Sequence, residues 1–432
     1  MNTLSNMPAL FILATGTELS TGRSKDTNSP YIANFLAERG YTIQGFATLP
    51  DDPLMLESYI VHAMLSGSDC VIMTGGLGPT EDDYTVDTIC KIFNTIPVED
   101  LPSLTKLEER IKVFKGRIEL NLARRQIRYP DGAKILRNRI GLAPGHLIKG
   151  LIQNKECMLA AMPGVPQEMK AMLEEELYPL LLKEQKPLEK TRKQFYVYGV
   201  GESNFQVEVF GKTQSDPDSL IHKENLSLPE DFVWGITAGN WRVKVFLESM
   251  KTDFIDILYH KIQTLYKEKM LPDHAAMLLH QHLSNVNKTL SFAESCTGGL
   301  LGKQITDMAG SSKYFHGSIV SYANSVKMNL LCVSKEILEN HGAVSSECAE
   351  AMALGAKRIT GSDYALAITG IAGPDGGSDE KPVGTVWLGL ADNHRTKTVK
   401  LFIPLDRDRI REYSASAALY VLYNFIMNHD YH

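Results

Sequence analysis

DCVIMTGGLGPTEDD, residues 69–83, joins a short apolar run to a loop that contains three glycines. The apolar part, 69–73, is typical of a buried strand that opens into a ligand-binding turn. Short apolar segments alternate with amphipathic segments on its amino-terminal side. The segments are strands at 9–14 and 41–49 and helices at 28–39 and 54–65. This alternation predicts an α/β domain with a parallel sheet covered on both faces, and such sheets bind ligands where their strands end.

The loop of this segment also carries Glu81, Asp82 and Asp83. Glycines let a backbone approach phosphates, and clustered carboxylates suit a hard divalent cation such as Mg²⁺ that bridges carboxylate and phosphate. The pattern indicates a metal-assisted phosphate ester or anhydride site. An ordinary turn before an acidic helix start explains the same residues equally well, since the helix dipole favours acids there.

A second candidate site lies in SFAESCTGGL, residues 291–300, and YANSVK, residues 322–327. Ser295 and Lys327 could act as nucleophile and base, because a lysine with a lowered pKa can activate a hydroxyl. A helix is predicted from 300 to 308, and its first N–H groups would face the seryl oxygen as an oxyanion hole. Alternatively, Ser295 caps the helix and Lys327 lies on the surface; the residues alone leave both open.

Length, charge and cysteine content disfavour several classes of protein. The chain has 432 residues, which is too long for one core, and a net charge of -6, which disfavours a nucleic-acid-binding role. Its six cysteines form no CxxC pair, and no apolar stretch reaches the ~20 residues of a membrane span. We found no targeting segment, so we expect a soluble, reduced, cytoplasmic protein that binds no membrane.

Two linker-like segments predict three domains. One is the charged, proline-bearing segment 183–193, and the other is Leu271-Pro272-Asp273. The predicted domains are 1–184, 185–268 and 269–432. The middle one reads as a small α+β unit without the GxxG loop of nucleic-acid-binding KH domains, so we expect it to connect or dimerise rather than bind nucleic acid.

The motif TGGLGPTEDDYT, with Gly16-Thr17-Glu18-Leu19 and Asp26-Thr27-Asn28-Ser29, resembles the amino-terminal domain of the CinA family. That resemblance implies a three-layer, molybdopterin-binding-like fold. It also implies hydrolysis of ADP-ribose to AMP and ribose 5-phosphate with a divalent metal, Mg²⁺ or similar, and potassium. By motif, the metal would bind Asp82 and Asp83. The residues implied to cradle phosphate or line the pocket are Glu18, Asp26, Asn28, Gly75, Gly76, Gly78 and Thr80.

AESCTGG, the tract 305–327 and the loop 367–377 are similar to the family's carboxy-terminal α/β domain, a nicotinamide mononucleotide amidohydrolase. The resemblance implies hydrolysis of nicotinamide mononucleotide to nicotinate mononucleotide and ammonia without a cofactor. Ser295 would be the nucleophile, Lys327 the base and Tyr322 an assisting group. The residues implied to bind substrate are Thr297, Gly298, Gly299, Asn324, Thr369, Gly370, Gly373, Gly376, Arg407 and Arg411.

The chain departs from the family's pattern in two places. Members usually carry a glutamate where this chain has Ser325, which would alter how Lys327 is held. Leu405 replaces a glycine ahead of the two arginines. The resemblance covers nearly the whole chain, gives the middle domain a KH-type fold and implies a role in pyridine nucleotide recycling. A homodimer is the default assembly. The alternative hypothesis is a nucleotide-sensing or competence-linked interaction protein with one or both sites inactive.

Overall fold

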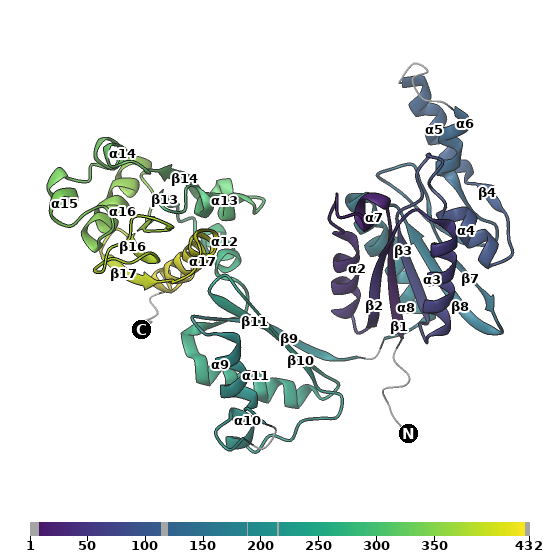
Figure 1. The fold of residues 1–432 in the computed structure, drawn as a ribbon, viewed down its shortest axis with the longest axis horizontal. Helices are drawn as coiled ribbons and strands as arrows, with labels where there is room; N and C mark the ends of the chain where they lie inside the picture. The colour runs from purple at the N-terminus through teal and green to yellow at the C-terminus, as the bar shows by residue number, and fades with distance from the viewer. Residues whose placement is uncertain (1–7, 114–119, 188, 214–215, 428–432) are drawn as a thin grey trace. The chain divides into compact units, whose positions relative to one another are not determined.

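The structure is a computed structural model, and it describes residues 8–113, 120–187, 189–213 and 216–427. The chain folds into two compact units, Met1–Lys190 and Thr191–His432 (Figure 1). The first predicted linker, 183–193, includes the break between these units. The further division of the second unit near residue 268 stays a prediction.

The first unit is built on a six-stranded sheet with the order β2-β1-β3-β8-β7-β6. Parallel pairing joins β1 to β2 and β3, and β3 to β8, whereas β7 pairs antiparallel with β8 and β6. The strands are β1 (Ala9–Thr15), β2 (Thr42–Leu49), β3 (Cys70–Thr74), β6 (Lys134–Leu136), β7 (Gly145–Ile152) and β8 (Lys155–Met162). The predicted α/β class is confirmed, with an antiparallel edge that the sequence did not indicate.

Two hydrophobic clusters lie on the two faces of this sheet, which gives three layers. Along β1, Leu10 and Ile12 belong to the cluster under α2, α7 and α8, and Leu13 belongs to the cluster under α3 and α4. This alternation follows from the two-residue repeat of a strand. The helices are α2 (Asn28–Ala37), α3 (Pro53–Leu65), α4 (Thr85–Ile92), α7 (Pro166–Met172) and α8 (Tyr178–Glu184).

Local signals explain where these helices begin. The Asp52 carboxylate accepts hydrogen bonds of 2.9 Å from the N–H groups of Leu54 and Met55, and Pro53 starts α3. Both features favour a helix start, because the first N–H groups have no partner inside the helix. The smaller elements are α1 (Thr17–Ser20), β4 (Pro97–Glu99), α5 (Leu101–Val113), α6 (Leu120–Ala123), a 3₁₀ turn (Arg124–Ile127), β5 (Arg128–Pro130) and a π-helical turn (Leu173–Leu177).

One buried histidine makes this unit sensitive to acid. His146 in β7 is fully buried, and neither ring nitrogen has a hydrogen-bond partner in the described part of the chain. Burial lowers the pKa of His146 from 6.5 to about 3, because the charged ring would lose its hydration. The native state therefore binds fewer protons than the unfolded state, and the free energy of unfolding falls as the pH falls from 6.5 towards 3.

We expect His146→Leu to remove this acid sensitivity. At roughly 1.4 kcal/mol per pH unit, His146 should cost the wild type about 2 kcal/mol of unfolding free energy between about pH 7 and about pH 5. Urea unfolding followed by far-UV circular dichroism at the two pH values would measure the difference. The exposed His62→Leu is the matched control and should keep the wild-type slope. An unchanged slope in His146→Leu would contradict the assignment.

The second unit contains a four-stranded antiparallel sheet with the order β10-β11-β9-β12. Its inward side chains, such as Phe195, Val197 and Val245, pack against Phe205 and Leu258 from the covering helices. The strands are β9 (Thr191–Tyr198), β10 (Val233–Gly239), β11 (Arg242–Ser249) and β12 (Met270–Leu271), and the helices are α9 (Glu202–Phe210), α10 (Leu220–Lys223) and α11 (Thr252–Tyr266). A 3₁₀ turn, Lys267–Lys269, follows α11. This is the small α+β arrangement predicted for the middle segment.

A five-stranded sheet with the order β14-β13-β15-β16-β17 follows. Strand β13 runs parallel to both of its neighbours, β14 and β15, whereas β16 pairs antiparallel with β15 and with β17. The strands are β13 (Leu290–Glu294), β14 (Phe315–Val320), β15 (Tyr364–Gly370), β16 (Thr385–Ala391) and β17 (Thr396–Phe402). The helices are α12 (Ala275–Val286), α13 (Leu300–Thr306), α14 (Asn324–Asn329), α15 (Lys335–Asn340), α16 (Ser346–Thr360) and α17 (Arg407–Ile426), and Ser311–Lys313 forms a 3₁₀ turn.

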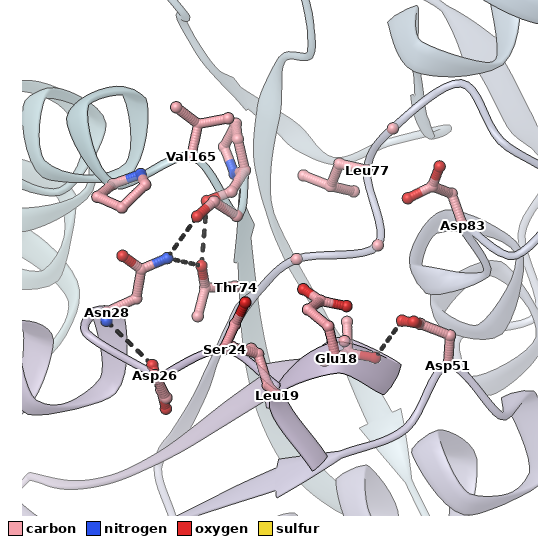
Figure 2. A pocket seen from close by; sticks show the side chains of 18 of the residues that line it. Glu18, Leu19, Ser24, Asp26, Asn28, Asp51, Thr74, Leu77, Asp83 and Val165 are labelled. Carbon is pink, nitrogen blue, oxygen red and sulfur yellow. Dashed lines mark hydrogen bonds between the residues drawn. The ribbon is translucent and has the colours of Figure 1, made fainter. Parts of the chain in front are cut away.

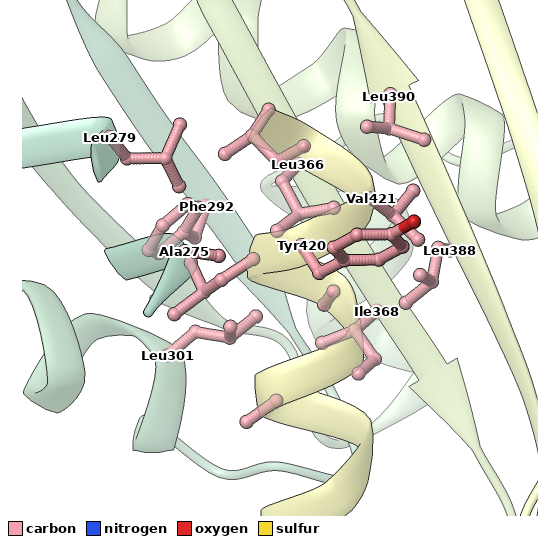
Figure 3. Close-up of a cluster of buried hydrophobic side chains, with 14 of the residues drawn as sticks. Ala275, Leu279, Phe292, Leu301, Leu366, Ile368, Leu388, Leu390, Tyr420 and Val421 are labelled. Atoms are coloured by element: carbon pink, nitrogen blue, oxygen red, sulfur yellow. The ribbon is translucent and has the colours of Figure 1, made fainter. Parts of the chain in front are cut away.

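Helices cover both faces of this sheet. Figure 3 shows Tyr420 and Val421 of α17 against strand residues that include Leu366 and Leu388. On the other face, α16 lies so close to β16 that a Cβ at Gly389 would come within 2.1 Å of a backbone oxygen of α16. The mixed α/β class predicted for this part is confirmed. Among the described residues, no helix combines the length and apolar character that a membrane crossing requires.

Candidate active sites

A cavity of about 560 Å³ opens in the first unit where β1 and β3 end (Figure 2). Thr15 and Thr74, the last residues of these strands, both lie in its wall. All nine residues predicted for the amino-terminal site line this one cavity: Glu18, Asp26, Asn28, Gly75, Gly76, Gly78, Thr80, Asp82 and Asp83. The structure therefore brings together side chains from three separate sequence motifs.

Two glycines after β3 allow the loop to approach the neighbouring strand. Gly75 and Gly76 have φ values of +103° and +64°, a region that favours glycine. A Cβ at Gly75 would lie 2.3 Å from the Thr15 carbonyl oxygen, and one at Gly76 would lie 2.2 Å from Thr85 Oγ1. Side chains have no room at either position, which keeps the loop backbone at the wall of the cavity.

Asp26 and Asn28 hold the wall opposite this loop. The Asn28 amide donates to Thr74 Oγ1 at 2.9 Å and to the Gly164 carbonyl at 2.8 Å, as Figure 2 shows. Asp26 Oδ1 accepts from the N–H groups of Asn28 and Ser29, each at 3.0 Å, at the start of α2. These bonds tie α2, β3 and the 163–165 turn to one another.

The carboxylates predicted to bind metal lie at the rim of the cavity. Asp83 Oδ2 accepts from the Thr80 N–H at 2.8 Å and from its hydroxyl, and Asp82 is exposed. Among the described residues, no three acidic, histidine or cysteine side chains lie close enough together to hold a metal ion by themselves. Mg²⁺ at nucleotide sites binds one or two carboxylates and completes its shell with substrate phosphates and water. Asp82 and Asp83 fit that arrangement, and they do not form a closed cage.

Two further acidic residues, Asp51 and Glu168, also line the cavity, although neither was predicted from the sequence. Asp51 follows β2 and accepts from Thr15 Oγ1 at 2.8 Å and from the Thr17 N–H at 2.8 Å, which fixes the turn after β1. Glu168 of α7 accepts from the Asn138 amide at 2.7 Å. Asp51 could have been found, because it lies two residues after the end of a predicted parallel strand.

In the second unit, Ser295 directly follows strand β13 and Lys327 lies on α14. Lys327 Nζ contacts Ser295 Oγ at 3.1 Å, the Ser321 carbonyl at 2.6 Å and the Tyr322 carbonyl at 3.2 Å. Lys327 is only 1% exposed, which rules out the surface lysine of the alternative interpretation. Burial lowers the pKa of Lys327, because the ammonium form loses hydration.

The three partners of Lys327 suit a neutral amine. The two carbonyls can only accept, so they take two N–H groups in either protonation state; the third position on Nζ then gives an N–H to Ser295 Oγ in the ammonium form or a lone pair to the Ser295 hydroxyl in the neutral form. Backbone carbonyls hold the lysine, so the absence of the family's glutamate at the exposed Ser325 does not release it.

Glu294 is a further buried residue at this site that the sequence analysis missed. Its side chain is 0% exposed and accepts five hydrogen bonds. The donors are Thr297 Oγ1 at 2.8 Å, Gly299 N at 2.9 Å, Leu301 N at 3.1 Å, Gly302 N at 2.9 Å and Ser318 Oγ at 2.6 Å. The N–H groups at the start of α13 are therefore already bonded and do not face Ser295, contrary to our expectation. An acid just before a glycine-rich helix start was the available signal.

Two arginines from the start of α17 reach the loops around Ser295. Arg411 donates from Nε to the Cys296 carbonyl at 3.2 Å and from Nη2 to the Thr297 carbonyl at 3.0 Å. Arg407 donates to the Gly373 carbonyl at 2.6 Å and, at 3.4 Å, to the hydroxyl of Tyr322, whose side chain is exposed. The arginines thus link the segments that follow β13, β14 and β15.

The other predicted binding residues lie on the same three segments or, for Thr369 and Gly370, at the end of β15. Thr369 is buried and its hydroxyl donates to the Ala343 carbonyl at 2.7 Å, whereas Asn324 is exposed at the start of α14. A Cβ at Gly370 would lie 3.2 Å from Cys296 Sγ, which places the end of β15 against the segment after β13. The other predicted glycines, Gly298, Gly299, Gly373 and Gly376, have positive φ values of +62°, +98°, +75° and +89°.

Comparison with known proteins identifies two family models that match this chain. The model described as the CinA C-terminal domain matches residues 273–426, and the one described as a probable molybdopterin binding domain matches residues 11–183. A CinA-like protein of Leptospira borgpetersenii serovar Hardjo-bovis is 38% identical over 432 residues, covering 97% of this chain and 98% of its own.

Two further matches are similar. A putative competence-damage inducible protein of Halothermothrix orenii is 36% identical over 419 residues, covering 96% of this chain and 98% of its own. The crystal structure of the competence/damage inducible protein CihA from Agrobacterium tumefaciens is 36% identical, covering 36% of this chain and 93% of its own with a TM-score of 0.34.

Proposed function

The chain belongs to the CinA family, and from this premise we propose that its carboxy-terminal domain hydrolyses the carboxamide of nicotinamide mononucleotide, giving nicotinate mononucleotide and ammonia. One observation supports the proposal most. The buried Lys327 Nζ lies 3.1 Å from Ser295 Oγ, within the distance that proton transfer between a nucleophile and its base requires.

The proposed reaction has two steps. Ser295 Oγ attacks the carboxamide carbon while Lys327 takes the hydroxyl proton, and Lys327 then gives that proton to the leaving ammonia. An ester between Ser295 and the nicotinoyl group remains. Water, deprotonated by Lys327, attacks this ester and releases the carboxylate, so that Ser295 recovers its proton.

The neighbouring thiol is a poorer nucleophile at this site. Cys296 directly follows Ser295 and is buried, and burial raises its pKa to about 12. Only the thiolate attacks readily, so Cys296 stays protonated at neutral pH. This favours the hydroxyl of Ser295, which has a base in hydrogen-bond contact.

For the amino-terminal domain we propose metal-dependent hydrolysis of the pyrophosphate bond of ADP-ribose. The cavity lined by all nine predicted residues supports this proposal. A bound cation would neutralise charge on the phosphates. Asp82 and Asp83 would hold that cation, and the backbone at Gly75 and Gly76 would approach the phosphate oxygens.

The two activities should respond differently to a chelator. With the purified chain, we expect ammonia release from nicotinamide mononucleotide to persist in EDTA, because a serine and a lysine need no metal. AMP release from ADP-ribose should stop, and added Mg²⁺ should restore it. Loss of ammonia release in EDTA would contradict the serine mechanism. No ammonia under any condition would favour the alternative, a nucleotide-sensing or interaction protein.

A further inference from the structure

The turn after Ser295 is held by a buried carboxylate. Glu294 precedes the nucleophile, and its two oxygens take three N–H groups from the start of α13 together with the hydroxyls of Thr297 and Ser318. Backbone N–H groups can only donate, so an ionised carboxylate suits all five partners, whereas an amide in its place would turn a donor towards at least one of them.

The backbone N–H groups around Ser295 are almost all engaged. Ser295 donates to the Ile368 carbonyl at 3.0 Å, Gly298 donates to the Ser295 carbonyl at 3.1 Å, and Gly299 donates to Glu294. Within the described residues of this turn, the N–H groups of Cys296 and Thr297 donate to no oxygen, and that of Cys296 lies beside its own thiol. They are the two residues that immediately follow the nucleophile.

The orientation of these two N–H groups is fixed from the other side of each peptide. In a trans peptide the N–H points away from the carbonyl of the preceding residue. The Ser295 carbonyl is held by the Gly298 N–H at 3.1 Å, which fixes the N–H of Cys296. The Cys296 carbonyl is held by Arg411 Nε at 3.2 Å, which fixes the N–H of Thr297.

We propose that the N–H groups of Cys296 and Thr297 form the oxyanion hole of this site, and that Glu294 is the positioning residue that holds them in place. The inference rests on the proposed amide hydrolysis, since it assigns the donors for the oxygen that becomes negative when Ser295 attacks. Glu294 contributes in two ways. It accepts a hydrogen bond from the Thr297 side chain, and it accepts the N–H groups at the start of α13, so that these N–H groups do not bind the substrate oxygen instead.

The rate at which a fluorophosphonate labels Ser295 tests this arrangement of donors without using the natural substrate. Ser295 Oγ attacks phosphorus, the P–F bond breaks, fluoride leaves, and Lys327 takes the hydroxyl proton. The phosphonyl oxygen occupies the oxyanion hole, so the labelling rate depends on the same N–H donors as amide hydrolysis does. Mass spectrometry would follow the labelling of Ser295. We would measure this rate together with kcat and KM for nicotinamide mononucleotide.

Glu294→Gln should lower both the labelling rate and kcat by roughly 10², the scale for loss of an oxyanion donor, with KM changed by less than about threefold. Glu336→Gln is the matched control, because it makes the same change at an exposed position on α15, and it should behave as wild type. A folded Glu294→Gln protein that is labelled at the wild-type rate would overturn the inference.

A second pair of variants covers the case in which Glu294→Gln does not fold. Thr297→Val removes the hydroxyl that donates to Glu294 and keeps the side-chain shape, whereas Thr297→Ser keeps the hydroxyl. We expect about a tenfold loss of labelling rate in the first and less than about threefold in the second. Equal rates in the two variants would contradict the role of Glu294.

The labelling experiment also separates this inference from the proposed substrate. If Ser295 is labelled and Glu294→Gln slows labelling while nicotinamide mononucleotide stays intact, the oxyanion assignment stands and the substrate assignment fails. If the wild type is neither labelled at Ser295 nor active on the nucleotide, both fail.

Discussion

Lys327→Ala should lower kcat for nicotinamide mononucleotide hydrolysis by roughly 10² or more, the scale of general-base catalysis. The lysine is buried against Ser295 Oγ, and no other side chain in the described part of the protein is hydrogen-bonded to that hydroxyl and could take its proton. Lys327→Arg should not rescue, because a guanidinium does not lose its proton at accessible pH. Ser295→Ala and the double variant should be about equally damaged, since nucleophile and base act as a unit.

The pH profile gives this prediction a second readout. The active form of Lys327 is the neutral amine, so kcat should rise with pH through the lowered pKa of Lys327 and level off above it. That rise should be absent from Lys327→Ala. The exposed Lys335→Ala serves as the control and should keep the wild-type rate and profile. Near-normal hydrolysis by Lys327→Arg would show that the lysine only binds substrate.

Asp83→Asn should abolish the proposed hydrolysis of ADP-ribose, with a loss of at least about 10², and leave amide hydrolysis unchanged. Asparagine keeps an oxygen for the Thr80 N–H and hydroxyl, so the loop should retain its shape while the charge that attracts a cation is lost. AMP release and ammonia release from the same preparation would measure the two effects.

The matched control for this prediction is Asp131→Asn, which makes the same change at an exposed position in the same unit. It should retain both activities. The predicted metal ligands and the Ser295 site lie in different units, so we expect the Asp83→Asn substitution to affect one activity only. A loss of both activities in a folded Asp83→Asn protein would contradict the assignment of one activity to each site.

Strong local patterns made much of the fold predictable. The apolar run predicted at 69–73 is β3, Cys70–Thr74, and the predicted helix 54–65 is α3, Pro53–Leu65. The hairpin of β7 and β8 escaped prediction because its turn carries a weak signal. Gln153 and Asn154 both have positive φ values, +48° and +64°, where such turns usually contain glycine.

The sites were predictable to the extent that their chemistry lies in short motifs. Glycines and acids after a strand indicated the amino-terminal cavity, and Ser295 with Lys327 indicated the second site. Two properties of the second site depend on contacts between distant residues. The burial of Lys327 could not be inferred from its neighbours in sequence, and the role of Glu294 depends partly on Ser318, which lies on another strand.

The division into two compact units, each with its own candidate site, has a consequence for the supply of the two proposed activities. Both sites are translated from one message as one polypeptide. Every molecule made therefore carries one copy of each, and no change in expression can alter their molar ratio. A cell that needs the two activities in a different proportion can achieve it only through substrate concentration, catalytic rate or selective inhibition of one site.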